Sequence, residues 1–242
     1  MSKFNYVFFG GVPRACSTIS VNILAQNPIF TISPTSGLVE IAYRIYKDEI
    51  NHFIQPNKNP LEIAKLSVDN LLTDFVKTPY YIDKSRNWIQ RHALHTNMFN
   101  NCKFIVGVRD VRGIYCSVEN LSGNFNSWER DVQNLTKVFK KKGKPDNVYV
   151  YKAEEFSINP EKVINEIYKF LDINLYNHTF NDLQELIPDS SWKATGIEEL
   201  HKIHSSIKKL DTSYDNLISK QKSNSLLEKY YDYQKIFYPE TI

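Results

Sequence analysis

The stretch Tyr6–Thr18, with the sequence YVFFGGVPRACST, constrains the fold of this chain more than any other. Tyr6–Phe9 is a short apolar run rich in aromatic residues, which predicts a buried strand. Gly10 and Gly11 then permit a tight turn that residues with a Cβ resist. Ile19–Gln26 follows with the apolar spacing of a helix. A strand, a glycine-containing turn and a helix predict a phosphate cradle, because backbone N–H groups and the positive end of the helix dipole face one anion.

Side chains in this cradle narrow the choice of ligand. Arg14 adds a fixed positive charge and a fork of donors, and the hydroxyls of Ser17 and Thr18 can donate to further phosphate oxygens. A nucleoside-triphosphatase loop would place Gly-Lys-[Ser/Thr] after the glycine and four further residues. The equivalent positions counted from Gly11 are Cys16, Ser17 and Thr18, so the lysine is missing. This argues against ATP or GTP hydrolysis.

Apolar runs and helical patterns alternate along the rest of the chain. Further strands are expected at Tyr80–Ile82, Phe104–Val108 and Val148–Tyr151. Helical spacing is found at Leu38–Tyr46, Pro60–Lys77, Trp88–Met98, Gly113–Val118, Trp128–Lys141, Pro160–Leu171 and Ser225–Phe237. Phe30–Gly37 is expected to be a loop, because it contains several residues that break regular structure. The alternation predicts an α/β fold, a P-loop-NTPase-like three-layer α/β/α arrangement with a central parallel sheet and a helical C-terminal part.

A second anion site is expected at the end of the Phe104–Val108 strand. Arg109 follows this strand directly, and Ser117 lies eight residues further on, along the next helix. A guanidinium at the strand exit and a hydroxyl on the following helix can bracket one phosphate. Ligands of open parallel sheets bind outside the carboxyl ends of the strands, so both anion sites are expected at one edge. The alternative is a solvated Arg-Asp-x-Arg cluster that caps a helix.

Together, the two motifs resemble those of sulfotransferases that use 3′-phosphoadenosine 5′-phosphosulfate (PAPS). Gly-Val-Pro-Arg-x-x-Ser-Thr is similar to their 5′-phosphosulfate loop, and Arg-Asp-x-Arg-x-x-x-x-Ser is similar to their 3′-phosphate motif. The run FGGVPR looks most like the tyrosylprotein and bacterial-type branches, although the family usually has Ser-Gly where this chain has Ala15-Cys16. The resemblance covers roughly residues 5–175. It implies one sulfotransferase-like domain over residues 1–242, in which residues 175–242 form a less regular, partly helical cap or acceptor-site region.

The resemblance also implies a cofactor and the residues that bind it. PAPS would be the sulfuryl donor, 3′-phosphoadenosine 5′-phosphate (PAP) the product, and no metal would be required. Cofactor contacts are expected from Gly11, Pro13, Arg14, Ala15, Cys16, Ser17 and Thr18 in the first motif and from Arg109 and Ser117 in the second. Tyr151 either approaches the adenine or serves as a packed core residue. Lys193 and Gly196 lie where relatives carry a segment that folds over the cofactor.

Catalytic roles are expected for Arg14, Lys84 and Glu40. Asp83-Lys84-Ser85 resembles the segment that carries a catalytic lysine in this family, and such a lysine would neutralise charge on the leaving phosphate. The alternative is a surface lysine paired with Asp83. The family's general-base glutamate would fall near Thr35 or Ser36, so Glu40, the nearest carboxylate, is the first choice for the base. The other candidates are Asp48, Glu49, His52 and His95, and Arg86 is a further residue that could face the cofactor.

Composition sets limits on partners and location. The formal net charge is only +3, which suits a small anionic ligand and gives little support for binding nucleic acid. Three cysteines at unrelated spacings indicate neither a disulfide framework nor a zinc site. No signal peptide and no membrane span are found in the sequence, so we expect a cytoplasmic protein of the bacterial or viral kind, without membrane partners.

Two alternative functions remain open from the sequence. One is a nucleotide or small-molecule kinase of the same architecture, against which the missing Gly-Lys argues. The other is a non-catalytic nucleotide-binding relative that has lost its acceptor base. The acceptor, whether a small molecule, a glycan or a peptide, and the oligomeric state are not specified by any motif.

Overall fold

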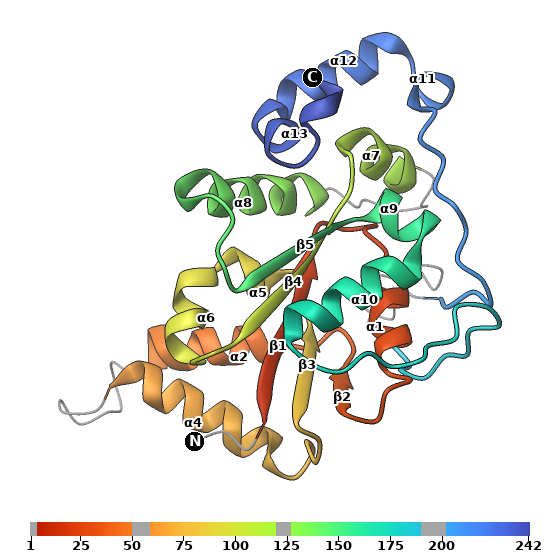
Figure 1. Ribbon diagram of the computed structural model, residues 1–242. Coiled ribbons are helices and arrows are strands. Elements are labelled where there is room, and N and C mark those ends of the chain that lie inside the picture. Colours follow the sequence, from red (N-terminus) through yellow and green to blue (C-terminus); the bar gives the residue numbers. More distant parts are fainter. Residues whose placement is uncertain (1–3, 50–58, 120–126, 190–201) are drawn as a thin grey trace.

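The computed structural model describes residues 4–49, 59–119, 127–189 and 202–242. At its centre lies a five-stranded sheet with the strand order β2-β3-β1-β4-β5 (Figure 1), and every pairing between neighbours is parallel. The strands are β1 (Asn5–Gly11), β2 (Phe30–Ser33), β3 (Tyr80–Lys84), β4 (Lys103–Val108) and β5 (Val148–Lys152). This sheet confirms the predicted α/β class with a central parallel sheet.

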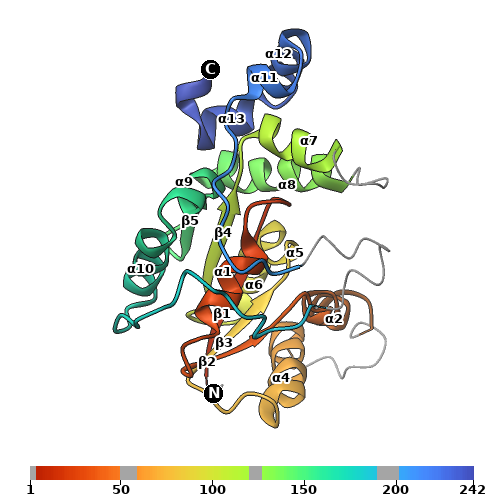
Figure 2. The same cartoon turned by 90° about the vertical axis from the view of Figure 1, so that its right-hand side faces the viewer.

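Helices cover both faces of the sheet, as Figures 1 and 2 show, which confirms the three-layer arrangement. One face carries α1 (Ser17–Leu24), α9 (Ala153–Ile158) and α10 (Pro160–Leu171). The opposite face carries α2 (Leu38–Arg44), α4 (Pro60–Thr73), α5 (Asn87–Gln90), α6 (His92–Met98), α7 (Val111–Glu119) and α8 (Ser127–Lys142). Within the described ranges, no helix combines the length and the apolar character needed to cross a bilayer.

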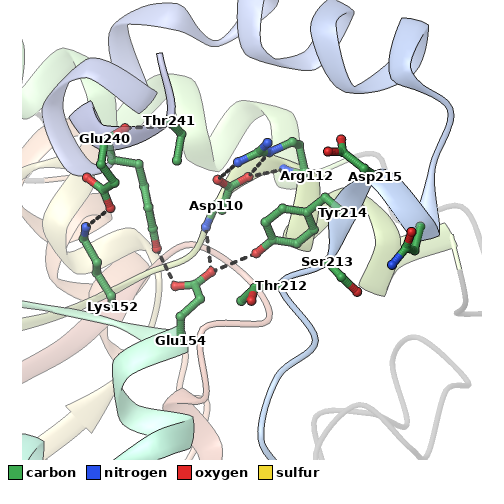
Figure 3. Close-up of a pocket in the computed structure, with 12 residues that line it drawn as sticks. Asp110, Arg112, Lys152, Glu154, Thr212, Ser213, Tyr214, Asp215, Glu240 and Thr241 are labelled. Atoms are coloured by element: carbon green, nitrogen blue, oxygen red, sulfur yellow. Dashed lines mark hydrogen bonds and ion pairs between the residues drawn. The ribbon is translucent and has the colours of Figure 1, made fainter.

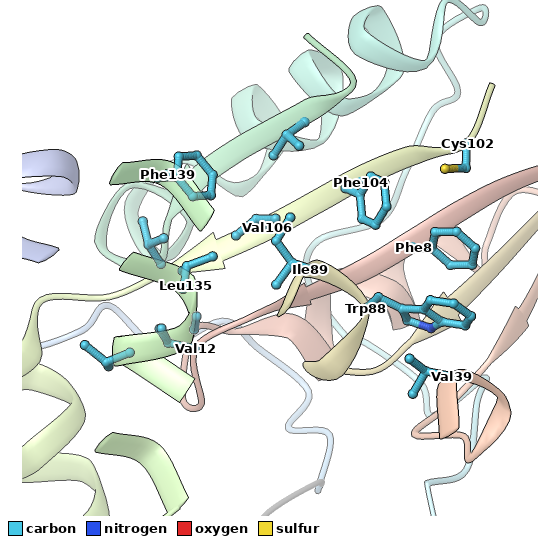
Figure 4. Packing of buried hydrophobic residues seen from close by; sticks show 14 of the residues in the cluster. Phe8, Val12, Val39, Trp88, Ile89, Cys102, Phe104, Val106, Leu135 and Phe139 are labelled. Carbon is cyan, nitrogen blue, oxygen red and sulfur yellow. The ribbon is translucent and has the colours of Figure 1, made fainter. Parts of the chain in front are cut away.

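Strand β1 is buried on both faces, which is why its sequence is a continuous apolar run. Val7 and Phe9 pack into the cluster beneath α1 and α10. Phe8 points to the other face and stacks on Trp88, with ring centroids 3.8 Å apart and an angle of 18° between the rings (Figure 4). Contacts between aromatic rings stabilise a core beyond the area that they bury. The strand is therefore held from both sides, and its carboxyl end is fixed in place.

The segment expected to be a loop, 30–37, begins with a strand instead. Residues Phe30–Ser33 form β2, which pairs in parallel with β3 from Phe30 opposite Tyr80 to Ser33 opposite Asp83. The residues that break regular structure all follow Ser33, so they end the strand rather than prevent it. Phe30 itself is buried and makes edge contacts with the rings of Tyr80 and Tyr168.

Helix boundaries also differ from the periodicity in several places. The helix expected at 88–98 is broken at Arg91, which has a non-helical backbone (φ −117°, ψ 38°) and separates α5 from α6. The helix expected at 225–237 starts earlier and is broken at Tyr230 into α12 (Lys220–Lys229) and α13 (Tyr231–Phe237). A π-helical turn, η1 (Ile45–Glu49), extends α2, and α4 ends at Thr73. The short helix α9 was not predicted.

The C-terminal helices join the main core rather than standing apart from it. Together with α11 (Tyr214–Leu217) and the 3-10 turn η4 (Pro239–Thr241), α12 and α13 lie against α7 and α8 at the top of Figure 1. Leu226, Tyr233 and Phe237 belong to the same buried cluster as the helices on that face of the sheet. The Tyr233 hydroxyl donates to the Arg109 carbonyl oxygen at 3.0 Å. The C-terminal part therefore helps to fix the backbone at the end of β4.

His95 lies in the aromatic core and predicts a dependence of stability on pH. Its side chain is fully buried, its Nδ1 lies 2.8 Å from the Trp88 carbonyl oxygen, and burial lowers its pKa to about 4. Between about pH 6.5 and pH 4 the unfolded chain therefore binds a proton that the folded chain excludes. We expect His95 to account for about 3 kcal/mol of the fall in the free energy of unfolding as the pH drops through this window. Urea unfolding at about pH 7 and pH 4.5, with and without His95, would measure this share.

The control for this prediction is His95→Gln, which removes the titrating group. In this variant the free energy of unfolding should depend less steeply on pH, by the amount that corresponds to one proton bound on unfolding. His178, whose pKa burial also lowers to about 4, should retain its own contribution in that variant. An unchanged slope in the variant would mean that His95 is not excluded from protonation in the fold.

Candidate functional site

The predicted phosphate cradle lies between β1 and α1 and is shaped by three backbone positions in the left-handed region. Gly11 has φ 122°, Arg14 has φ 63° and Cys16, which caps α1, has φ 60°. A Cβ on Gly11 would lie 2.0 Å from the carbonyl oxygen of Gly107 on the neighbouring strand β4. The next residue, Val12, donates its N–H to that same oxygen at 3.0 Å. Only glycine can therefore occupy position 11 while the loop stays bonded to β4.

Cys16 takes the left-handed conformation at the position where the family usually has glycine. This conformation costs a residue with a side chain about 1 kcal/mol. The side chain is half-buried and packs against the clusters on both faces of the sheet. Burial raises the pKa of the Cys16 thiol to about 11. The thiol stays protonated near neutral pH, so it adds no negative charge beside the cradle.

Tyr151 of β5 contacts the backbone of the cradle. Its side chain is buried, and its hydroxyl donates to the Ala15 carbonyl oxygen at 2.8 Å. Gly107 makes room for this contact, because a Cβ there would lie 2.7 Å from the Tyr151 hydroxyl and 3.0 Å from the Ala15 oxygen. The structure thus places Tyr151 as a packed residue beneath the loop, the second of the two roles expected from the sequence.

The two predicted anion motifs converge at the carboxyl edge of the sheet. Arg14 Nε donates to Ser117 Oγ at 2.9 Å, and a terminal nitrogen of Arg109 donates to the Arg14 carbonyl oxygen at 3.1 Å. Burial, and then the charge of Arg109, lower the pKa of Arg14. Residues about a hundred positions apart in sequence therefore form one positively charged site.

Arg109 is the residue of this site with an unused donor. It is only 8% exposed, and its Nε has no hydrogen-bond partner among the described residues. Buried guanidinium nitrogens normally have a partner, because an unpaired polar group is costly in a low-dielectric interior. Two guanidinium groups side by side, one with an unpaired buried N–H, fit a bound anion. The residues present thus fit a phosphate-bearing ligand.

Lys84 is buried at the carboxyl end of β3 beside the cradle. Its Nζ donates to Thr18 Oγ1 at 3.1 Å and forms an ion pair with Asp189 Oδ2 at 2.8 Å. The side chains are 6% and 2% exposed. Burial lowers the pKa of Lys84, whereas the Asp189 carboxylate opposes this shift. Lys84 is therefore not the surface lysine of the alternative interpretation.

Asp83, the other partner considered for Lys84, is bonded elsewhere. Its carboxylate accepts hydrogen bonds from the Ser36 hydroxyl, the Tyr81 hydroxyl and the Trp88 indole. Burial raises its pKa, and these three donors oppose the shift. Asp83 thus ties the segment that follows β2 to the core and leaves Lys84 to Asp189.

Glu40, the expected base, lies in the first turn of α2. Its Oε1 accepts from the Asn87 amide at 2.8 Å and lies 3.7 Å from a guanidinium nitrogen of Arg91. Its side chain is 46% exposed. The described contacts do not join Glu40 to the cradle or to Lys84, so its role as the base stays a prediction.

The remaining candidates are placed as follows. His95 is enclosed in the core and Arg86 pairs with Asp131 of α8 at 2.5 Å. His52, Lys193 and Gly196 lie outside the described residues, as do the side chains of Asp48 and Glu49. The buried carboxylate of Asp189 was not predicted. Thr35, where the family's glutamate was expected, donates to Asp189 Oδ2 at 3.0 Å.

A separate cavity of about 560 Å³ lies beyond the ends of β4 and β5 (Figure 3). It is lined by more carboxylates than cations: Asp110, Glu154, Asp215 and Glu240 against Arg112 and Lys152. The cations pair with Asp110 at 2.7 Å and with Glu240 at 2.6 Å. Glu154 accepts from the backbone N–H of Asp110 and from the Tyr238 hydroxyl. These contacts brace the backbone next to Arg109, and the acidic lining does not suit a phosphate.

Comparisons with known proteins bear on the fold. No protein-family model matches the chain, and a comparison with curated protein sequences finds no match. Among solved structures, it is similar to the sulfotransferase domain of the curacin biosynthetic pathway, with a TM-score of 0.56 and 14% identity over 93% of this chain and 97% of that domain. The sulfotransferase domain of the Synechococcus PCC 7002 olefin synthase matches with a TM-score of 0.56 and 16% identity over 96% of each chain.

A third match is mouse sulfotransferase SULT7A1 in complex with PAP, with a TM-score of 0.53 and 11% identity over 98% of this chain and 86% of that one. This chain has the sulfotransferase fold. At these identities the likeness concerns the fold alone, so the chemistry has to be argued from the residues of this chain. The sulfotransferase fold here presents an arginine pair, a glycine-bearing cradle and a buried lysine at one sheet edge.

Proposed function

We propose that this protein is a sulfotransferase that moves a sulfuryl group from PAPS to a hydroxyl or amine of an acceptor. The observation that carries the proposal is the convergence of Arg14, Arg109 and Ser117 beside the cradle. A strand-to-helix turn alone provides one anion site. PAPS carries anionic groups at both its 5′ and 3′ positions and therefore requires two. A pair of arginines next to a separate helix N-terminus suits such a ligand.

The residues divide between the two ends of the cofactor. The cradle from Gly11 to Thr18 would hold the 5′ phosphosulfate through backbone N–H groups and hydroxyls, and Arg109 and Ser117 would hold the 3′-phosphate. Arg14, bonded to Ser117, links the two halves. When bound, PAPS supplies an activated sulfuryl group: the sulfur–bridging oxygen bond breaks as the acceptor atom bonds to sulfur, and the electron pair remains on the phosphate.

Lys84 would act on the leaving side of the reaction. It extends from the end of β3 to Thr18 in the first turn of α1, where the 5′ end of the cofactor would lie. A buried ammonium stabilises developing negative charge more strongly than one in water, because the surroundings have a low dielectric constant. Its burial and its place beside the cradle support the proposed catalytic role of Lys84.

A calorimetric titration with PAP and with AMP, without Mg²⁺, tests this function. We expect the protein to bind PAP more tightly than AMP, since only PAP has a 3′-phosphate. Arg109→Ala should weaken PAP binding about 100-fold or more, because a charge-assisted contact in a buried site is lost. AMP binding should change by no more than about threefold. A protein that binds both nucleotides equally would not have the proposed cofactor site.

The matched control for this titration is Arg44→Ala, which removes the same charge from an exposed position at the end of α2. Its affinity for PAP should stay close to that of the wild type, because exposed charges are screened by salt. Equal losses in the two variants would show that net charge, and not the geometry of Arg109, governs binding.

A further inference from the structure

A strap formed by residues 178–189 crosses helix α1 and ends at the candidate site. Asn22 of α1 is buried and holds the strap with three hydrogen bonds. Its amide donates to the Gln184 carbonyl oxygen at 2.6 Å, and its Oδ1 accepts from the N–H groups of Leu186 and Ile187. Just beyond the end of α1, Gln26 bonds both the N–H and the carbonyl group of Thr179. The helix that follows the cradle and the turn after it thus anchor the strap at two places.

The strap brings Asp189 to the centre of the site. Asp189 lies two residues beyond the last contact with Asn22, and its side chain is only 2% exposed. Its Oδ2 accepts from Lys84 of β3 at 2.8 Å and from Thr35, which follows β2, at 3.0 Å. Lys84 in turn donates to Thr18 of α1. A carboxylate from a distant part of the chain is therefore held in the site by Lys84 of β3 and by Thr35.

The Lys84–Asp189 ion pair would be affected by a phosphate bound in the cradle. Lys84 is its described cationic partner, and the charge of Arg86 also acts on Lys84. A phosphate group beside Thr18 would compete with Asp189 for the Lys84 ammonium. If Lys84 turned to the phosphate, Asp189 would lose the positive charge of Lys84, and loss of a neighbouring positive charge raises the pKa of a buried carboxyl group. A buried carboxylate with a raised pKa is well suited to accept a proton near neutral pH.

We propose that Asp189 is the acceptor-side carboxylate of this site: it neutralises Lys84 before PAPS binds, and afterwards it takes the acceptor's proton on an Oδ atom. The proposal rests on the proposed function. Lys84 would act at the leaving phosphate and Asp189 at the acceptor, on opposite sides of the transferred sulfuryl group. The strap and Asn22 also gain a role as positioning elements, because they hold Asp189 at Lys84.

The first test measures binding rather than turnover and uses PAP as the probe. Calorimetry in buffers of different ionisation enthalpy, near pH 6.5, reports the protons taken up on binding. We expect Asp189→Asn to bind PAP about 5- to 20-fold more tightly, since a competing negative charge is removed. The proton uptake attributable to Asp189 should disappear in this variant. Weaker PAP binding, or an unchanged proton uptake, would overturn the proposal.

The control variant is Asp69→Asn, which removes another carboxylate that pairs with a lysine, Lys65, and with the Tyr6 hydroxyl. Tyr6 lies near the amino end of β1, so this pair is at the opposite end of the strand from the cradle. PAP affinity and proton uptake should match the wild type in this variant. If wild type itself shows no preference for PAP over AMP, the proposed function has failed, and that result is distinct from a failure of the assignment of Asp189.

The second test follows the release of PAP from PAPS with water as the acceptor, as a function of pH. Asp189→Asn should lower the turnover rate by about 10²- to 10³-fold, the usual contribution of a general base, and should remove the acidic limb of the pH profile. Asp189→Glu should recover part of both. A variant that binds PAP more tightly but keeps the wild-type rate and pH profile would make Asp189 a counter-ion only and would overturn its role as the base.

Discussion

Gly11→Ala is expected to destabilise the fold by about 4 kcal/mol or more and to abolish PAP binding. At φ 122° an alanine is strained by itself, and its Cβ would also meet the Gly107 carbonyl oxygen at 2.0 Å. That oxygen accepts the N–H of Val12, so the clash falls on the bond that fixes the cradle to β4. Urea unfolding and PAP calorimetry on the same preparation would measure both losses.

Gly143→Ala separates the strain of the backbone from the clash. Gly143 also has a positive φ, 70°, but a Cβ there would meet nothing within 4 Å. This control should cost only about 1 kcal/mol, the usual penalty for a side chain in the left-handed region, and should leave PAP binding intact. Similar costs for the two variants would mean that β1 and β4 can move apart at the cradle, contrary to the close approach seen in the structure.

Most of the fold could be predicted because its signals are local. The runs that form β1, β3, β4 and β5 are apolar, and amphipathic helices separate them, so a covered parallel sheet follows from periodicity. Strand β2 was missed because it has only four residues and is followed at once by Pro34 and Ser36. Its strand geometry depends on pairing with β3, which is a long-range contact that local pattern does not encode.

In the candidate site too, residues in local motifs could be predicted, and residues that depend on long-range contacts could not. Arg14, Arg109 and Ser117 were predicted because each lies at a fixed spacing from a strand that is itself recognisable. Their direct contacts, such as Arg14 with Ser117, then follow from the meeting of the strand ends at one edge. The side chain of Asn22 gave no such signal: a polar residue on an otherwise apolar helix is explained only by the strap that it binds.

Asp189 shows most clearly what sequence reasoning lacks. It is 105 residues from Lys84, in an irregular segment with no periodicity from which to infer its environment. The sequence search for a base therefore stayed near Thr35 and settled on Glu40, the nearest carboxylate in the chain. In the fold, Thr35 is bonded to Asp189. The sequence search thus reached a residue that the structure places beside a buried carboxylate from a distant segment.

Lys84→Met is expected to have two large effects that can be separated. Removal of Lys84 takes away a buried partner of Asp189, which should lower the free energy of unfolding by about 3–5 kcal/mol. Loss of the buried ammonium beside Thr18 should also lower the rate of sulfuryl transfer by about 10³-fold or more, because that charge would stabilise the leaving phosphate. Urea unfolding and PAP release from PAPS would measure the two effects.

The double variant Lys84→Met, Asp189→Asn distinguishes structural from chemical loss. With both charges gone, most of the lost stability should return, since replacing a buried ion pair by neutral groups is often nearly neutral. Transfer should not return, because the leaving phosphate would lack the Lys84 ammonium and the acceptor proton would lack the Asp189 carboxylate. The half-buried pair Lys65–Asp69 is the reference: its corresponding single variants should cost about 1 kcal/mol or less. Recovery of transfer together with stability would show that Lys84 serves the fold and not the reaction.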